Sequence, residues 1–73
     1  MMYILVHAAL LTFSTEPSVF AMGAYDTKVE CVQAMHSDVE ATGARVTSSS
    51  LYEVKATQYG NKFSWKCDAV YNR

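Results

Sequence analysis

Hydrophobic and polar positions along the chain predict two pairs of strands with one helix between them. Residues 3–13 and 19–25 are rich in strand-forming side chains, and the polar stretch 14–18, which contains Pro17, supplies the turn between them. Later in the chain, Gly60 and Asn61 separate two runs in which apolar and polar residues alternate. Each pair of runs therefore predicts an antiparallel hairpin.

The helix is predicted between residues 27 and 43. Thr27 follows Asp26 and precedes Glu30 by three residues, which is the spacing of a capping box at a helix N-terminus. Gly43 suits the left-handed position that ends a helix. At helical spacing, the apolar stripe is expected on Val29, Val32, Met35, His36 and Val39. Such a helix covers one face of a sheet.

The register of the second hairpin follows if Tyr59 pairs with Lys62. Apolar residues then lie opposite one another, in the pairs Ala56 with Trp65, Val54 with Cys67 and Tyr52 with Ala69. For residues 50–58 the alternative is a short helix capped by Ser50, with Glu53 at the third helical position. The polar residues 45–50 are expected to form a loop or a ragged strand start. The predicted fold class is α+β, ββαββ, with one helix packed on one face of an antiparallel sheet.

Length and composition limit the chain to a single domain, residues 1–73. A chain of 73 residues buries only about 60% of the surface that its unfolded form exposes, which leaves room for one core. With 51% hydrophobic and 18% charged residues, the composition is typical of a folded protein and excludes a disordered one.

The first hairpin carries more apolar surface than one helix can cover. Its first strand is hydrophobic on both faces, and antiparallel sheets that face water normally have polar residues on the outer side. We therefore expect a second copy of the chain, or another protein, to cover the remaining face. The residues expected to mediate self-association, with a homodimer as the first expectation, are Ile4, Val6, Leu10, Phe20 and Met22. A second candidate surface for a partner protein consists of Tyr59, Phe63 and Trp65. The alternative is that the polar segment around residues 44–50 or the chain ends fold over the apolar face.

The two cysteines, Cys31 and Cys67, leave two interpretations open. A disulfide between them closes a loop of 36 residues, for which the chain-entropy estimate gives roughly 3 to 4 kcal/mol. Alternatively, both are reduced thiols that pack as small hydrophobic side chains. Neither pair formed with His7 and His36 has the spacing of a zinc finger, so no metal site is expected.

No motif of an enzyme or a cofactor site occurs in the sequence. The patterns GxSxG, HExxH, GxxxxGK[ST] and GxGxxG are all absent. Cys31 and His36 are five residues apart and point about 140° away from one another on a helix, so they form no local dyad. His7 and His36 are both expected to be histidines at the edge of the core. The sequence therefore predicts a protein that is not an enzyme and has no cofactor.

Charge also argues against nucleic acid as a partner. The net charge is −1, although residues 1–44 hold one lysine against five acids and residues 45–73 hold five basic residues against two acids. In the basic second half, strand alternation places Phe63 and Trp65 on the face opposite Lys62 and Lys66. A surface that stacks bases needs aromatic and basic groups on the same face.

The apolar opening is too short to cross a membrane. Residues 1–11 fall well below the ~20 residues that a bilayer requires, so no membrane partner is expected. The same stretch, with Pro17 and the small-residue site Val19-Phe20-Ala21, imitates a secretory signal peptide, but no Lys or Arg precedes it.

Three segments carry a resemblance to known proteins, namely MMYILVHAALL, YDTKVECVQAM and WKCDAV. With them, the chain resembles the small two-cysteine orphan proteins that bacteriophages and proteobacteria encode. These proteins share no established activity, so the resemblance implies a compact two-cysteine fold and a mobile-element origin without assigning a site. Together with the small size, it implies a phage-type inhibitor of a host protein, acting in anti-defence or host takeover in the cytoplasm of an infected or lysogenic bacterium. The alternative, from a different class, is a periplasmic or secreted structural protein stapled by Cys31 and Cys67.

Overall fold

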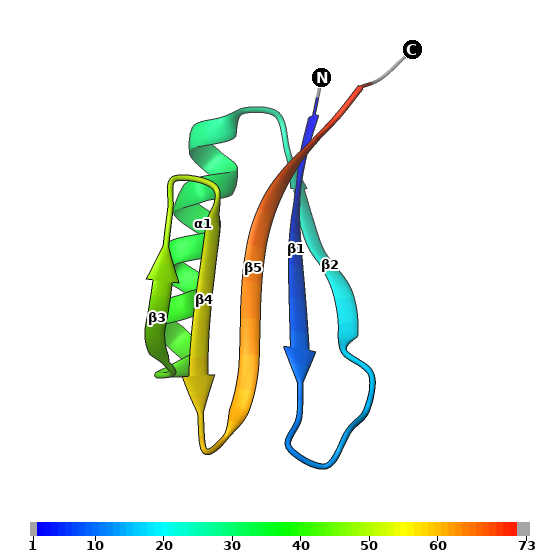
Figure 1. Ribbon diagram of the computed structural model, residues 1–73. Coiled ribbons are helices and arrows are strands. Elements are labelled where there is room, and N and C mark those ends of the chain that lie inside the picture. Colours follow the sequence, from blue (N-terminus) through cyan, green and yellow to red (C-terminus); the bar gives the residue numbers. More distant parts are fainter. Residues whose placement is uncertain (1, 72–73) are drawn as a thin grey trace.

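A computed structural model describes residues 2–71 and shows one helix packed against a five-stranded antiparallel sheet (Figure 1). The elements are β1 (Met2–Leu10), β2 (Ser18–Tyr25), α1 (Lys28–Thr42), β3 (Arg45–Ser49), β4 (Glu53–Gln58) and β5 (Asn61–Val70). The strand order in the sheet is β2-β1-β5-β4-β3. The expected α+β class, with one helix on an antiparallel sheet, is confirmed. One strand is added, because β3 forms where a loop or a ragged strand start was expected.

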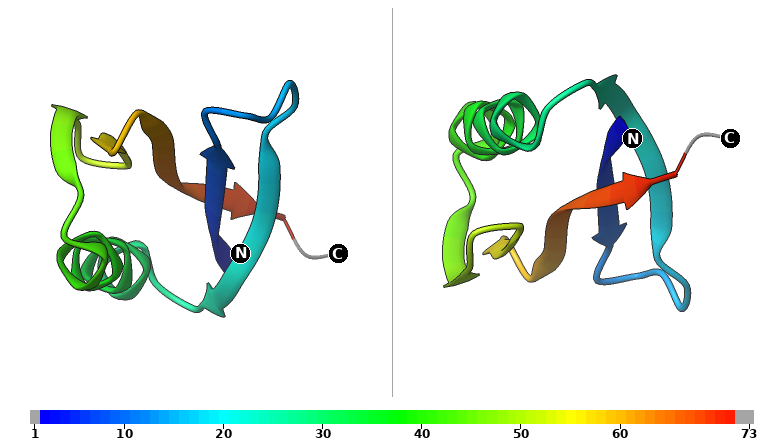
Figure 2. Two further views of the ribbon diagram at one scale, coloured as in Figure 1. Left: turned by 90° about the horizontal axis from the view of Figure 1, so that it is seen from below. Right: turned by 90° about the horizontal axis from the view of Figure 1, so that it is seen from above.

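The first and last strands lie side by side at the centre of the sheet. β1 pairs with β5 from Met2 opposite Val70 to Leu10 opposite Lys62, and its other edge pairs with β2. The views along the strands show α1 on one side of the twisted sheet only (Figure 2). We call the other side, which α1 leaves uncovered, the outer face.

Local hydrogen bonds fix both ends of α1, as the sequence predicted. Thr27 is the N-cap, and its Oγ1 accepts a hydrogen bond of 3.2 Å from the backbone N–H of Glu30. The same hydroxyl donates to Oε1 of Glu30 at 2.9 Å. At the other end, Gly43 has φ 70° and its N–H donates to the carbonyl of Glu40.

The face that α1 buries contains Met35 and Val39 of the expected stripe, with Val32 partly buried against the core, but it includes Cys31 in place of Val29 and His36. Its buried residues are Cys31, Met35 and Val39, which follow one another at a spacing of four. Val29 and His36 are exposed instead, so the placement of both on the apolar stripe was wrong. The helix is turned toward Cys31 because this residue is joined to β5.

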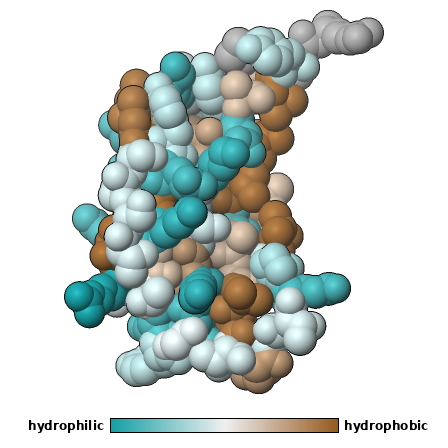
Figure 3. Space-filling model, viewed as in Figure 1, coloured by the Kyte–Doolittle hydropathy of each residue, from teal (hydrophilic) through white to brown (hydrophobic). Residues whose placement is uncertain are grey.

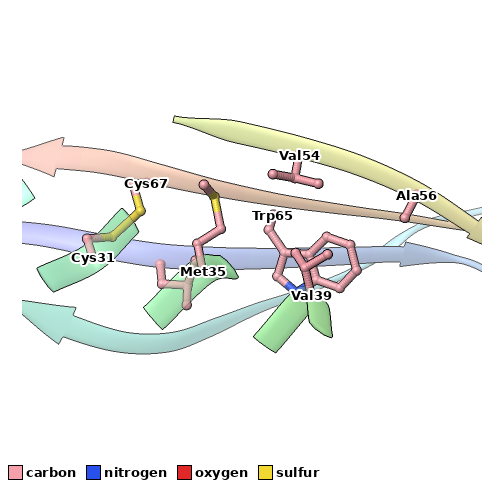
Figure 4. Packing of buried hydrophobic residues seen from close by; sticks show 8 residues of the cluster. Cys31, Met35, Val39, Val54, Ala56, Trp65 and Cys67 are labelled. Carbon is pink, nitrogen blue, oxygen red and sulfur yellow. A yellow bond between two sulfur atoms is a disulfide. The ribbon is translucent and has the colours of Figure 1, made fainter. Parts of the chain in front are cut away.

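A disulfide between Cys31 and Cys67 connects α1 to β5 (Figure 4). The two Cα atoms are 6.1 Å apart, within the usual range for a disulfide. Of the two interpretations left open by the sequence, the structure therefore has the bonded one.

The second hairpin forms with a register two residues away from the predicted one. Its two-residue turn is Tyr59-Gly60, with φ values of 51° and 82°, and Gln58 pairs with Asn61. Positive φ at both positions is typical of a type I′ turn, whose twist matches that of the flanking strands. β4 is a strand, so the helical alternative for residues 50–58 was wrong.

The register change exchanges partners without changing faces. Val54 lies opposite Trp65, where Cys67 was expected, and Ala56 lies opposite Phe63. Because side chains alternate with a period of two, the apolar residues stay on the helix side of the sheet.

Eight hydrophobic side chains form the buried core (Figure 4). They are Leu5, Cys31, Met35, Val39, Val54, Ala56, Trp65 and Cys67. Trp65 is fully buried, and its indole N–H donates to Oδ2 of Asp38 on α1 at 2.6 Å. The core thus draws on β1, α1, β4 and β5, whereas neither β2 nor β3 contributes a buried side chain.

Candidate functional site

The edge strand β2 and the loop before it expose large apolar side chains. Within β2, Val19 is 63% exposed, Phe20 54% and Met22 47%, and in the preceding loop Phe13 is 84% exposed. β2 is the last strand of the sheet on its side, so no strand of residues 2–71 pairs with its second edge. The edge therefore combines free backbone hydrogen-bonding groups with apolar side chains.

A β-bulge at Met22 interrupts the regular alternation of β2. Val6 pairs with Ala21 and Leu5 pairs with Gly23, which leaves Met22 as the extra residue. Paired residues share a face, so Ala21 lies on the outer face with Val6. A glycine inside a strand often marks such a bulge, and Gly23 was the only indication of it in the sequence.

The bulge also separates the residues expected to mediate self-association. Ile4, Val6 and Leu10 alternate along β1 on the outer face, where all three are half-buried. Phe20 pairs with His7, which lies on the helix side of the sheet with Trp65. The five predicted residues therefore occupy one hairpin but not one face.

The outer face is apolar over β1 and β2 and polar over β5. Figure 3 looks onto this face and shows hydrophobic and hydrophilic patches side by side. The outward residues of β5 are Lys62, Ser64, Lys66, Asp68 and Val70. Lys66 lies opposite Val6 and forms an ion pair of 3.4 Å with Asp68. Within residues 2–71, no segment folds over the β1–β2 part of this face, so the alternative in which the 44–50 segment covers it was wrong: those residues form β3 at the opposite edge.

The second candidate surface does not exist as one surface. Trp65 is at the centre of the core, and Phe63 packs against the core. Tyr59 is 91% exposed in the β4–β5 turn. Trp65 and Phe63 are therefore corrected from partner-binding to structural residues, because their strand positions face α1.

The two histidines have different surroundings. The His7 ring stacks on Trp65 with ring centroids 4.7 Å apart, and its Nδ1 lies 3.0 Å from the carbonyl oxygen of Ser64. His7 is half-buried, as expected for a histidine at the edge of the core, whereas His36 is exposed. In the described part of the chain, no three His, Cys, Asp or Glu side chains come together as metal ligands do.

Two of the shallow hollows in residues 2–71 lie on the outer face and beside α1. One, of about 280 Å³ on the outer face, is lined in part by Leu10, Lys55 and Lys62. The other, of about 190 Å³, lies between α1 and the β3–β4 loop, where its lining includes Val29, Leu51 and Tyr52. At its rim, Nζ of Lys28 is 5.2 Å from the centroid of the Tyr52 ring, and hydrogen bonding to the Tyr52 side chain raises the pKa of Lys28 above its ordinary value.

The fold and the exposed strand define a small α+β domain with one apolar, unpaired sheet edge. None of the helices in residues 2–71 has the length and hydrophobicity needed to span a membrane. Comparison of the chain with models of protein families, with curated protein sequences and with solved structures finds no match.

Proposed function

We propose that this chain is a non-enzymatic protein-binding module that self-associates, as a homodimer, through the β1–β2 hairpin. One observation carries the proposal: β2 is apolar in sequence yet contributes none of the eight buried side chains of the core. A strand whose hydrophobic residues, apart from Tyr25, lie outside the core of its own domain is typical of an interaction site. Covering Val19, Phe20 and Met22 removes apolar surface from water, which stabilises the complex by about 25 cal/mol for each Å² buried.

Self-association is tested with a pair of variants matched in residue type and exposure. Val19 on β2 and Val29 on α1 are 63% and 64% exposed. We expect wild-type protein and Val29→Lys to sediment as dimers, and Val19→Lys to sediment as the 8.1 kDa monomer. Charge substitution of Phe20 should likewise separate the protomers while the fold remains intact. Wild-type protein that stays monomeric at about 100 μM, well above the Kd of a specific homodimer, would falsify the proposal.

The finer proposal is a phage-type inhibitor of a host protein that acts in the bacterial cytoplasm. Its support is the resemblance to small two-cysteine phage and proteobacterial proteins, together with a size that leaves room for one binding surface and one core. The test is purification of the tagged chain from its host followed by mass spectrometry. A host protein retained by the wild type and by Val29→Lys, but lost with Val19→Lys, supports a partner that binds at β2.

The disulfide favours a second candidate, a periplasmic or secreted structural protein. Cys31 and Cys67 are bonded, and disulfides persist in oxidising compartments. Cleavage after the Val19-Phe20-Ala21 site would remove β1, the strand between β2 and β5, together with the first four residues of β2. Intact mass of the protein from its native source separates the two candidates. An oxidised chain from the periplasm supports export, and a reduced chain from the cytoplasm supports the inhibitor.

A further inference from the structure

We infer that the second copy binds by adding its β2 antiparallel to β2 of the first, so that two five-stranded sheets become one continuous ten-stranded sheet. This inference rests on the proposed self-association and specifies its geometry. A twofold axis perpendicular to the sheet relates the two copies and places both α1 helices on the same side. The free backbone groups along the outer edge of β2 then pair with one another.

Exposure on both faces of β2 favours this geometry over face-to-face packing. Val19 projects to the outer face and Phe20 to the helix side, and each is more than half exposed. A copy stacked on the outer face covers Val19 but leaves Phe20 in water. A strand added to the edge brings a new neighbour to both rows of side chains.

The available area leads to the same choice. On β1, the outer-face residues Ile4, Val6 and Leu10 are already half-buried, so stacking on them removes little further surface from water. The large exposed areas lie on β2 and on the loop that carries Phe13. A stable interface takes about 800 Å² from each partner, about a sixth of the 5050 Å² of the chain, so the interface must draw on the loop that carries Phe13 as well as on β2.

Charge is compatible with a second copy as the occupant. Ser18–Tyr25 contains no charged residue, so two β2 strands meet without repulsion along their ladder. The opposite edge of the sheet, β3, begins with Arg45 and is otherwise mostly serine and threonine. Polar and charged residues protect edge strands from pairing, and β2 lacks this protection.

The symmetry restricts the register. A twofold axis perpendicular to the sheet leaves each side chain on its own face, so a residue can lie opposite only its own equivalent or one an even number of positions away. Before the bulge at Met22, the regular part of β2 consists of residues 18–21. Centring the pair on Val19 places Ala21 opposite Pro17, which has no N–H to donate. Centring it on Phe20 puts Pro17 opposite Gly23, beyond the bulge at Met22 and outside the regular paired segment. Phe20 then faces Phe20 of the second copy, and Val19 faces Ala21 of the second copy.

Sedimentation equilibrium of two lysine variants tests the geometry. Phe20→Lys introduces a charge at the centre of the paired edge, and we expect it to raise the dimer dissociation constant by about 100-fold. Ile4→Lys introduces a charge on the outer face of β1, opposite Asp68. We expect this variant to dimerise within about threefold of the wild type, because edge pairing leaves the outer face of β1 open.

Cysteine cross-linking provides the second readout. Phe20→Cys places two thiols directly opposite one another, about 5 Å apart between Cα atoms, and should form an interchain disulfide under mild oxidation. Val19→Cys places its two thiols diagonally, about 7 to 8 Å apart between Cα atoms, and should remain uncrosslinked. Intact mass confirms that Cys31–Cys67 stays closed in both variants.

The outcomes separate the geometry from the self-association itself. Cross-linking of Phe20→Cys alone, with Phe20→Lys monomeric, supports edge pairing. Cross-linking of Val19→Cys as readily as Phe20→Cys, or an Ile4→Lys variant as weak as Phe20→Lys, overturns edge pairing and leaves self-association through the outer face. A monomeric wild type overturns both.

Discussion

Reduction of the disulfide should remove a large part of the stability of this domain. Cys31 and Cys67 are 36 residues apart, and the bond is the covalent link between α1 and β5. The loop-closure estimate for a ring of this length is roughly 3 to 4 kcal/mol. A chain of 73 residues is stabilised in total by roughly 4 to 11 kcal/mol, so reduction removes between about a quarter and all of it.

Urea unfolding with and without dithiothreitol measures this loss. Trp65 is the only tryptophan and is fully buried, so its fluorescence reports unfolding of the core. With a urea m-value of about 1 kcal/mol/M, reduction should lower the midpoint by roughly 3 to 4 M. The double variant Cys31→Ala with Cys67→Ala is the control: it should unfold near the midpoint of the reduced wild type and not respond to dithiothreitol. If the reduced and oxidised midpoints agree within about 0.5 M, the loop-closure reasoning does not apply to this fold.

Three further predictions concern single contacts, each checked by the same fluorescence titration. Asp38→Ala leaves the buried indole N–H of Trp65 without an acceptor and should lower the free energy of unfolding by about 1 to 3 kcal/mol. Asp38→Asn keeps an acceptor oxygen and should lower it by less. Equal losses in the two variants would exclude a role for the hydrogen bond. Thr27→Ala should cost about 1 kcal/mol through loss of the N-cap, and Thr27→Ser should restore most of it. Gly43→Ala should lower the free energy of unfolding by about 1 kcal/mol through its positive φ alone, because nothing lies within 4 Å of the added Cβ. Gly60→Ala should lower it by more, because its added Cβ would come to 2.6 Å from Cγ2 of Thr12. A larger loss for Gly43→Ala than for Gly60→Ala would contradict the packing of that turn.

The ends of the helix could be predicted from the sequence because they depend on contacts between near neighbours. Thr27 and Glu30 form hydrogen bonds with each other within the first turn, and Gly43 ends the helix because its backbone adopts a left-handed conformation. The face of the helix could not be predicted in the same way. Met35 can share an apolar stripe either with Val29 or with Cys31. The disulfide to Cys67 on the distant strand β5 decides in favour of Cys31.

In the hairpins, the sequence likewise predicted which residues share a face of the sheet better than it predicted which residues pair. Alternation of apolar residues placed Val54 and Trp65 on the helix side correctly, because a slip of two residues preserves the faces. It could not fix the partners, because the turn uses Tyr59 at positive φ, a conformation that is uncommon outside glycine. In β2, one extra residue at Met22 moved Phe20 away from the face of Val6, and a period of two does not anticipate a bulge.

The proposed association through β2 and the disulfide are expected to stabilise the same fold by independent routes. The bond joins α1 to β5, whereas β2 supplies none of the eight buried side chains, so reduction does not alter the β2 edge directly. A partner that binds only the folded state adds about 4.1 kcal/mol when its concentration is 1,000 times the dissociation constant, which is comparable to the loss on reduction. Under reducing conditions, we therefore expect the proposed dimerisation to compensate for the missing bond. We expect the urea midpoint of the reduced wild type to rise with protein concentration, and that of reduced Phe20→Lys to stay constant and low. A reduced wild type whose midpoint does not change over a hundredfold range of concentration would show that association contributes nothing to folding.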